Sequence, residues 1–215
     1  MTKIYVLFLL LLFSRSFSQT YEFDFLTKYS MENFKNKSTY DFVSYHNSDD
    51  FSYVLRLRKT DSDFTATIYD SQRNLAHDFD VIESKVSGEI QFQFNYITSS
   101  KMEKIKAPKN YRYEFSEISP NIPKIIALKV YPSKRSNNPI AECTITLANA
   151  NKNLMPIYGS EVCHISRNDN NPISNAGNYI VSKTVAKNKN YQYETKLTEY
   201  KNVSFKIVVG EKTEL

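Results

Sequence analysis

Three runs of alternating apolar and polar residues between positions 51 and 81 constrain this fold most strongly. Side chains of an extended strand point to opposite faces in turn, so this spacing lets a strand bury one face. Short polar breaks join the runs, which predicts an antiparallel meander with one apolar face. The apolar positions are Phe51, Tyr53, Leu55 and Leu57, then Phe64, Ala66 and Ile68, then Leu75, His77, Phe79 and Val81.

Similar alternation before and after this region predicts ten to twelve strands and no long helix. We interpret residues 21–34 as one strand, with a short strand and a helical turn as the alternative. The predicted fold is all-β, an antiparallel meander that curls into a half-barrel or a two-layer sandwich. The other predicted strands cover residues 40–45, 90–96, 111–115, 124–131, 140–147, 179–185, 191–197 and 203–209, with a further short one around 161–165.

The first 18 residues have the pattern of a cleavable signal peptide. Lys3 precedes an unbroken apolar run of ten residues from Ile4 to Phe13, and Ser16 and Ser18 stand before a plausible cleavage point. Ten residues are too few to cross a bilayer, which takes about 20. We therefore expect export to the periplasm or the extracellular space, with no transmembrane anchor after cleavage.

The remaining chain, residues 19–215, is predicted to be one β-rich domain. The tract 148–178 has little periodicity and is a weak candidate for a domain boundary. The net charge is +5, and loss of Lys3 and Arg15 with the signal peptide leaves +3. Both charge signs are mixed along the chain, whereas a nucleic-acid-binding protein would show a clustered basic face, so we expect no nucleic-acid partner.

Cys143 and Cys163 are the two cysteines of the chain. An export compartment favours a disulfide between them, which would contribute about 3 kcal/mol in the chain-entropy model. Two buried thiols are the alternative. Because neither cysteine lies near the cleavage point, the chain is not expected to be an N-terminal lipoprotein.

Glycine is scarce, with only Gly88, Gly159, Gly177 and Gly210 in the chain. Phosphate-binding loops and the sharp nucleophile turn of serine hydrolases use clustered glycines, which are absent here. We expect no cofactor. No metal site is expected either, since the oxygen-rich turns lack the spacing of a calcium loop. Cys163 and His164 would point to opposite faces of a strand, which argues against a catalytic dyad.

A charged strip is predicted on the polar face of the meander. Arg56 and Arg58 of one strand would lie near Thr65 and Thr67 of the next strand. Those threonines would in turn neighbour two carboxylates of the third strand, Asp78 and Asp80. We interpret the strip as a solvated face, and a binding strip or an acid–base pair is the functional alternative.

The apolar face of the same strands offers a candidate pocket. His77 lies on this face between Leu75 and Phe79, where it could line the pocket or act as an acid–base group, although a hydrogen-bonded histidine at the rim of a core is commoner. Two tyrosine pairs, Tyr111 with Tyr113 and Tyr191 with Tyr193, could also stack on a ligand or pack in the sheet. The candidate pocket residues are Phe51, Tyr53, His77, Phe92 and Phe94.

These features favour an exported, soluble, non-enzymatic binding protein. Its partner would be an apolar small molecule held on the concave sheet face, or a protein of the cell envelope. A surface adhesion module is the second hypothesis. An enzyme with a site built from His77, Asp78, Asp80 and Arg56 is the third, and we expect no cleft in which titratable groups converge.

Overall fold

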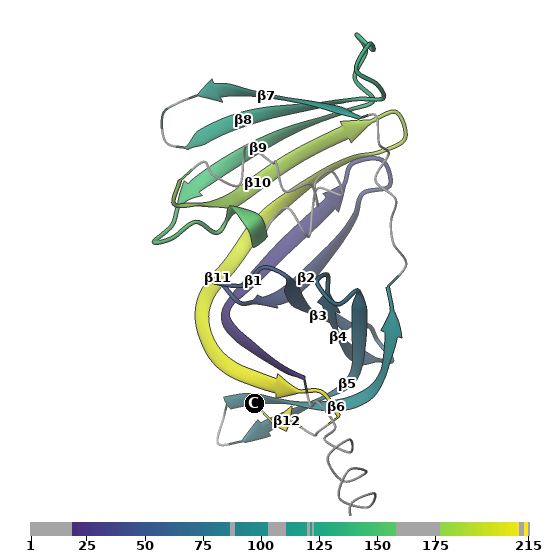
Figure 1. The fold of residues 1–215 in the computed structure, drawn as a ribbon, viewed down its shortest axis with the longest axis vertical. Coiled ribbons are helices and arrows are strands. Elements are labelled where there is room, and N and C mark those ends of the chain that lie inside the picture. The colour runs from purple at the N-terminus through teal and green to yellow at the C-terminus, as the bar shows by residue number, and fades with distance from the viewer. Residues whose placement is uncertain are drawn as a thin grey trace, which may run out of the picture.

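The computed structural model describes residues 19–86, 89–102, 111–119, 121, 123–157, 177–210 and 213–214. In this part of the chain nearly all the regular structure is β-strand, and residues 155–157 form a single helical turn. The prediction of an all-β, antiparallel protein with little helix is therefore confirmed (Figure 1). The proposed signal peptide, residues 1–18, lies outside the described residues.

Among the described residues, twelve strands form one antiparallel sheet in the order β12-β6-β5-β4-β3-β2-β1-β11-β10-β9-β8-β7, which does not close into a barrel. β1 to β6 form one meander and β7 to β11 form another. The strands are β1 (Thr20–Asn33), β2 (Ser38–His46), β3 (Tyr53–Lys59), β4 (Phe64–Asp70), β5 (Leu75–Val86), β6 (Glu89–Lys101), β7 (Arg112–Ser119), β8 (Lys124–Tyr131), β9 (Ala141–Asn149), β10 (Tyr179–Asn188), β11 (Gln192–Val208) and β12 (Thr213–Glu214).

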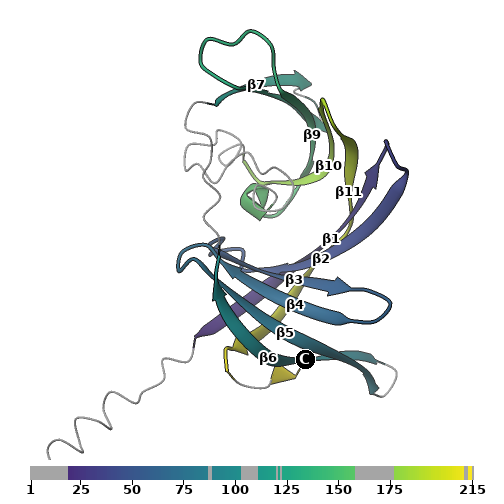
Figure 2. The same cartoon turned by 90° about the vertical axis from the view of Figure 1, so that its right-hand side faces the viewer.

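The first and last long strands join the two meanders at the middle of the sheet. β1 pairs with β2 on one side and with β11 on the other. Both β1 and β11 bend strongly along their length, so the sheet has two differently oriented halves (Figures 1 and 2). We call β3 to β6 with the neighbouring ends of β1, β2 and β11 the first half, and β7 to β10 with the other ends the second half.

The two halves bury opposite faces of the sheet. In β2, Val43 and Tyr45 pack toward the core of the first half, whereas Phe42, just before Val43, packs toward the core of the second half. In β1, Leu26 belongs to the first core and Tyr29 to the second. The central strands are therefore buried on both faces, as the consecutive buried residues 25–27 of β1 and 44–46 of β2 show.

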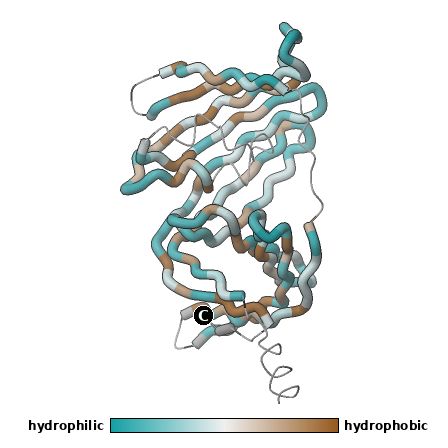
Figure 3. Tube along the Cα trace, in the orientation of Figure 1, coloured by the Kyte–Doolittle hydropathy of each residue, from teal (hydrophilic) through white to brown (hydrophobic). Residues whose placement is uncertain are grey.

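The first core is rich in aromatic rings and the second is mainly aliphatic. Figure 3 shows hydrophobic and hydrophilic residues in alternation along the strands that enclose each core. The buried first core contains Tyr21, Phe23, Leu26, Tyr45, Leu55, Ala66, Ile68, Phe79, Val81, Phe94 and Ile207. The buried second core contains Tyr29, Ile126, Leu128, Val130, Cys143, Ile145, Leu147, Met155, Val181 and Ala186.

The structure corrects two strand assignments. β3 begins at Tyr53, and Phe51 lies in the preceding turn, where Asp50 accepts a hydrogen bond from the backbone of Ser52 (2.9 Å). The runs at 191–197 and 203–209 belong to a single strand, β11, because extra residues of β11 are accommodated as irregularities in its pairing with β1. The short strand proposed around 161–165 lies outside the described residues.

The sheet continues on both sides of the tract 148–178. β9 and β10, which flank it, pair directly, with Asn149 opposite Tyr179. The helical turn within the tract packs on the sheet: Leu154 and Ile157 are buried with Phe25 and Ile180, and Phe51 packs against them. In the ranges described, no helix is long and apolar enough to cross a membrane.

Candidate functional site

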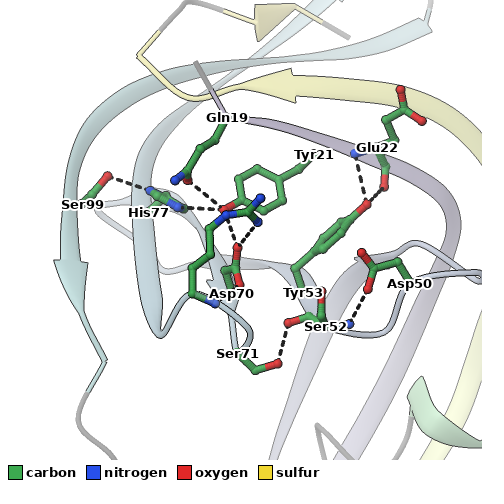
Figure 4. A network of polar contacts seen from close by, with 11 residues as sticks. Gln19, Tyr21, Glu22, Asp50, Ser52, Tyr53, Asp70, Ser71, His77 and Ser99 are labelled. Carbon is green, nitrogen blue, oxygen red and sulfur yellow. Dashed lines mark hydrogen bonds and ion pairs between the residues drawn. The ribbon is translucent and has the colours of Figure 1, made fainter. Parts of the chain in front are cut away.

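A buried polar network in the first half links the start of β1 to β4, β5 and β6 (Figure 4). The Tyr21 hydroxyl lies 2.8 Å from Asp70 Oδ2 and 3.0 Å from His77 Nε2. The other ring nitrogen of His77 lies 2.6 Å from Ser99 Oγ. The side chains of Tyr21, Asp70 and His77 are buried, with exposures of 1%, 0% and 1%.

Asp70 is the charged centre of this network. Burial opposes ionisation of its carboxyl group, but hydrogen bonds from Arg73 and Tyr21 outweigh burial and lower the pKa of Asp70. The Arg73 guanidinium donates to Asp70 Oδ2 at 2.8 Å, and the Arg73 backbone N–H donates to Oδ1 at 2.7 Å. Asp70 is therefore an ionised carboxylate with both oxygens hydrogen-bonded.

The protons of the network can be assigned from these contacts. Burial and the neighbouring carboxylate raise the pKa of Tyr21, and burial lowers the pKa of His77, so both groups are neutral at pH 7. The single hydroxyl proton of Tyr21 goes to the Asp70 carboxylate, which is a stronger acceptor than Gln19 Oε1, 3.0 Å from the same hydroxyl. His77 then donates from Nε2 to the Tyr21 oxygen, and its bare Nδ1 accepts the proton of Ser99.

Titratable groups therefore do converge, although we expected no convergent cleft. They converge inside the core, where the chain itself covers Tyr21, Asp70 and His77. A catalytic group must reach its substrate. The exposed members are Arg73, which binds Asp70, and Ser99, which binds His77 and also lies 2.7 Å from the Tyr96 hydroxyl. The contacts thus tie the start of β1 to three other strands and keep buried polar groups satisfied.

The predicted charged strip forms with the expected neighbours. Arg56 lies opposite Thr67, and Thr67 lies opposite Asp78 and donates a hydrogen bond to it (2.8 Å). One pair further along, Arg58 lies opposite Thr65 and Thr65 opposite Asp80. Arg58 and Asp80 are exposed, and Arg56 lies over the ring of Tyr69 at 5.7 Å. The solvated-face interpretation and the binding alternative both remain predictions.

The strip continues into the buried centre of the sheet, which the sequence interpretation missed. Arg56 pairs with Ser44 of β2, and Ser44 pairs with Thr27 of β1. The Thr27 hydroxyl lies 3.0 Å from Nε2 of His46, which is 2% exposed. Burial, with a smaller effect of the Arg56 charge, lowers the pKa of His46 to about 3, so His46 is neutral.

The candidate pocket of the first half is only partly assembled. Tyr53, Phe92 and Phe94 contribute to the first core, and His77 joins it through ring contact with Tyr21 at 5.5 Å. Phe51 packs instead with the helical turn. The Phe94 ring lies 6.4 Å from the rings of both Phe79 and Phe205, so ring contacts occupy the space beneath it.

A second aromatic surface borders the core of the second half. Tyr113 pairs with Val130 and Phe115 with Leu128, so these rings share a face with the buried second core. This is the concave face, because Met155 of the helical turn packs into the same core and the turn lies inside the curve of β7 to β10 (Figure 2). The half-buried aromatic residues packed against this core are Phe42, Tyr111, Tyr113, Phe115, Tyr179 and Tyr193.

Both tyrosine pairs singled out in the sequence lie beside the second half. Tyr191 and Tyr193 have ring centroids 5.3 Å apart, and Tyr191 is 40% exposed.

Cys143 is a buried thiol in the second core, and Cys163 lies outside the described residues, so their disulfide stays a prediction. Within the described ranges, no group of three His, Cys, Asp or Glu residues is placed to hold a metal ion.

Comparison with known proteins adds no functional assignment: no protein-family model matches the chain, and no curated protein sequence matches it.

Proposed function

We propose that this protein is an exported, non-enzymatic binding protein that holds an apolar small molecule on the concave face of its second half. In this proposal the second half is an open half-barrel. The observation that carries it is the aromatic border of the second core, where half-buried rings such as Tyr113, Phe115 and Tyr193 surround an aliphatic floor. Binding surfaces for small molecules are concave and mostly apolar, with aromatic side chains at their edges.

The contrast with the first half supports this location. The rings of Phe23, Phe94 and Phe205 pack on one another in the first core, with Phe205 lying 5.0 Å from Phe23 and 6.4 Å from Phe94. A ligand there would have to displace these rings. In the second half the described chain adds one helical turn to the concave face, and the aromatic residues at its border remain partly exposed.

Fluorescence of N-phenyl-1-naphthylamine, an apolar dye, tests the proposal. The purified protein should bind the dye, and Tyr113→Ala combined with Phe115→Ala should weaken binding at least tenfold, since each lost ring removes apolar contact area. Phe92→Ala in the first half is the matched control and should leave dye binding unchanged. Native mass spectrometry of protein from the export compartment should also show a retained small molecule.

Two results would contradict the proposal. The first is a folded protein that does not bind the dye. The second is binding that survives loss of Tyr113 and Phe115 but is lost with Phe92, which would place the ligand in the first half. Far-UV circular dichroism of each variant confirms that the sheet is intact.

A further inference from the structure

Two hairpin turns lie side by side at one end of the sheet. The turn between β1 and β2 covers residues 34–37, and the turn between β10 and β11 covers residues 189–191. Asn33 pairs with Tyr193, and the Phe34 backbone N–H donates to the carbonyl of Gln192 at 2.9 Å. Both views show the two hairpins ending at the same end of the sheet (Figures 1 and 2). We call these turns, with the adjoining residues Lys187, Asn188 and Tyr40, the paired turns.

Asparagine side chains hold both turns in a defined shape. Asn36 Oδ1 accepts hydrogen bonds from the backbone and hydroxyl of Ser38 (3.1 and 2.7 Å). Asn188 Oδ1 accepts from the backbones of Asn190 and Tyr191 (2.7 and 2.9 Å). Such side-chain contacts replicate a backbone turn and fix its conformation. The residues that the turns present are therefore preorganised, which lowers the entropy lost on binding.

The paired turns present exposed aromatic rings. Phe34, Tyr40 and Tyr191 are 41%, 53% and 40% exposed. Tyr40 lies opposite Met31 in the register of β1 and β2 and packs near Phe42, with ring centroids 6.4 Å apart. Tyr40 therefore rests beside the ring of Phe42, and Tyr191 rests in the same way beside Tyr193, with ring centroids 5.3 Å apart. Exposed aromatic residues grouped in this way mark an interaction surface.

The same turns are basic. They carry Lys35, Lys37, Lys187 and Lys189, all exposed, and no carboxylate occurs in residues 34–37 or 187–191. Glu142 of β9 lies opposite Lys187 on one side and Lys129 on the other, and Asp41, next to Tyr40, is bound by Lys28 at 3.0 Å. Behind the turns, Glu32 and Glu194 are a cross-strand pair, and Glu194 is bound by Lys183 at 2.7 Å. The ion pairs among the described residues use other lysines: Lys28, Lys59, Lys124, Lys152, Lys183 and Lys201.

This combination fits the surface of an anionic membrane. Aromatic rings with an apolar body and a polar edge concentrate at the membrane–water interface, and lysines near it are attracted by anionic head groups. An exposed phenylalanine adds apolar area that a purely electrostatic partner would not use. We propose that the paired turns dock the protein on a membrane rich in anionic phospholipid, with the rings at the interface and the lysines on phosphate groups.

Sedimentation with vesicles tests this docking. The protein should bind vesicles made of equal amounts of phosphatidylglycerol and phosphatidylcholine and should not bind pure phosphatidylcholine. Replacing all four lysines of the paired turns by alanine should lower binding at least about tenfold, because each contributes a separate attraction to the anionic surface. Phe34→Ser combined with Tyr40→Ser should also lower binding, and this loss should persist at high salt.

A matched set of lysines controls for net charge. Lys85, Lys101, Lys129 and Lys206 are exposed on other parts of the sheet, and their replacement by alanine removes the same charge. This set should change vesicle binding less than twofold. Equal losses in the two sets, or no binding to anionic vesicles, would overturn the proposal.

Two further measurements separate this surface from other partners and from the proposed ligand site. If heparin binds the protein with the same dependence on the four lysines but the Phe34 and Tyr40 substitutions change nothing, the surface recognises a polyanion and the membrane proposal is wrong. The four-lysine variant should retain binding of N-phenyl-1-naphthylamine. A failure of the membrane proposal would therefore not contradict the proposed ligand site.

Discussion

The two halves of this sheet are built from neighbouring strands of one chain, yet they fill their interiors in different ways. In the first half, aromatic rings such as Phe79 and Phe94 meet in the centre, and a charged carboxylate, Asp70, is buried against the Tyr21 hydroxyl of the same core. In the second half, aliphatic side chains such as Leu128 and Ile145 fill the centre, and aromatic rings stand at its border.

The first half contains directional contacts that fix one structure, whereas the second half leaves aromatic rings partly exposed at its border. Hydrogen bonds of the Tyr21–Asp70–His77 network are directional, so they fix one arrangement of β1 against β4, β5 and β6. Aliphatic packing in the second half is less directional and tolerates local change. We expect the first half to respond strongly to single substitutions and the aromatic border of the second half to respond weakly.

The largest effect is expected for Phe94→Ala in the first half. Phe94 is fully buried, and the rings of Phe79 and Phe205 pack against it, so its removal leaves a cavity that the other rings cannot fill. The free energy of unfolding should fall by about 4 kcal/mol, against about 3 kcal/mol for Leu128→Ala in the second core. Urea denaturation measures both, and a smaller loss for Phe94→Ala would contradict the comparison.

Asp70→Asn should give the next largest effect. The amide keeps the shape but loses the charge that binds Arg73 and accepts the Tyr21 proton, which leaves buried donors poorly paired. We expect a loss of about 3 kcal/mol in unfolding free energy. Asp78→Asn, whose side chain is half-buried and bound by Thr67, serves as the control and should cost less than about 1 kcal/mol.

Acid should destabilise the protein through its buried histidines. The folded-state pKa of His46, about 3, lies below the usual value of 6.5, so the unfolded chain binds more protons below pH 6.5. The contribution of His46 to the free energy of unfolding should be constant above about pH 6.5. Below that pH it should fall by up to about 1.4 kcal/mol per pH unit. His77, whose pKa is also lowered by burial, acts in the same direction.

His46→Gln isolates this contribution. The variant should unfold with a shallower dependence on pH between about 6 and 4, a range above the ordinary pKa of aspartate, where carboxylates such as Asp70 add little. Urea denaturation at a series of pH values gives the slopes. An unchanged slope in the variant would show that His46 is not the neutral, buried group that the structure indicates.

The smallest effect should come from the border of the second half. Tyr113 is only half-buried, so Tyr113→Ala should cost less than about 1 kcal/mol in unfolding free energy, although it is expected to weaken ligand binding. Thermal denaturation followed by circular dichroism checks this. A loss as large as that of Phe94→Ala would mean that Tyr113 belongs to the core rather than to a binding surface.

Some of the candidate site could be predicted from sequence because local rules govern it. Alternation placed Arg56, Thr67 and Asp78 on one face of neighbouring strands, and the structure adds the register in which they lie opposite one another. Asp70 lies beyond the predicted run that ends at Ile68, although it continues the buried face of Ala66 and Ile68 in β4. Its position two residues after Ile68 was the one sign in the sequence that the Asp70 side chain would be buried in this core.

The sequence by itself determined most of the strands, their alternating faces and the hairpin neighbours, since each depends on residues close together in the chain. Tertiary structure alone decided that β1 pairs with β11 and that the two halves bury opposite faces. It also brought Tyr21 to Asp70, 49 residues away. A pattern of period two says which side chains share a face, but pairing between distant strands depends on contacts that no local pattern contains.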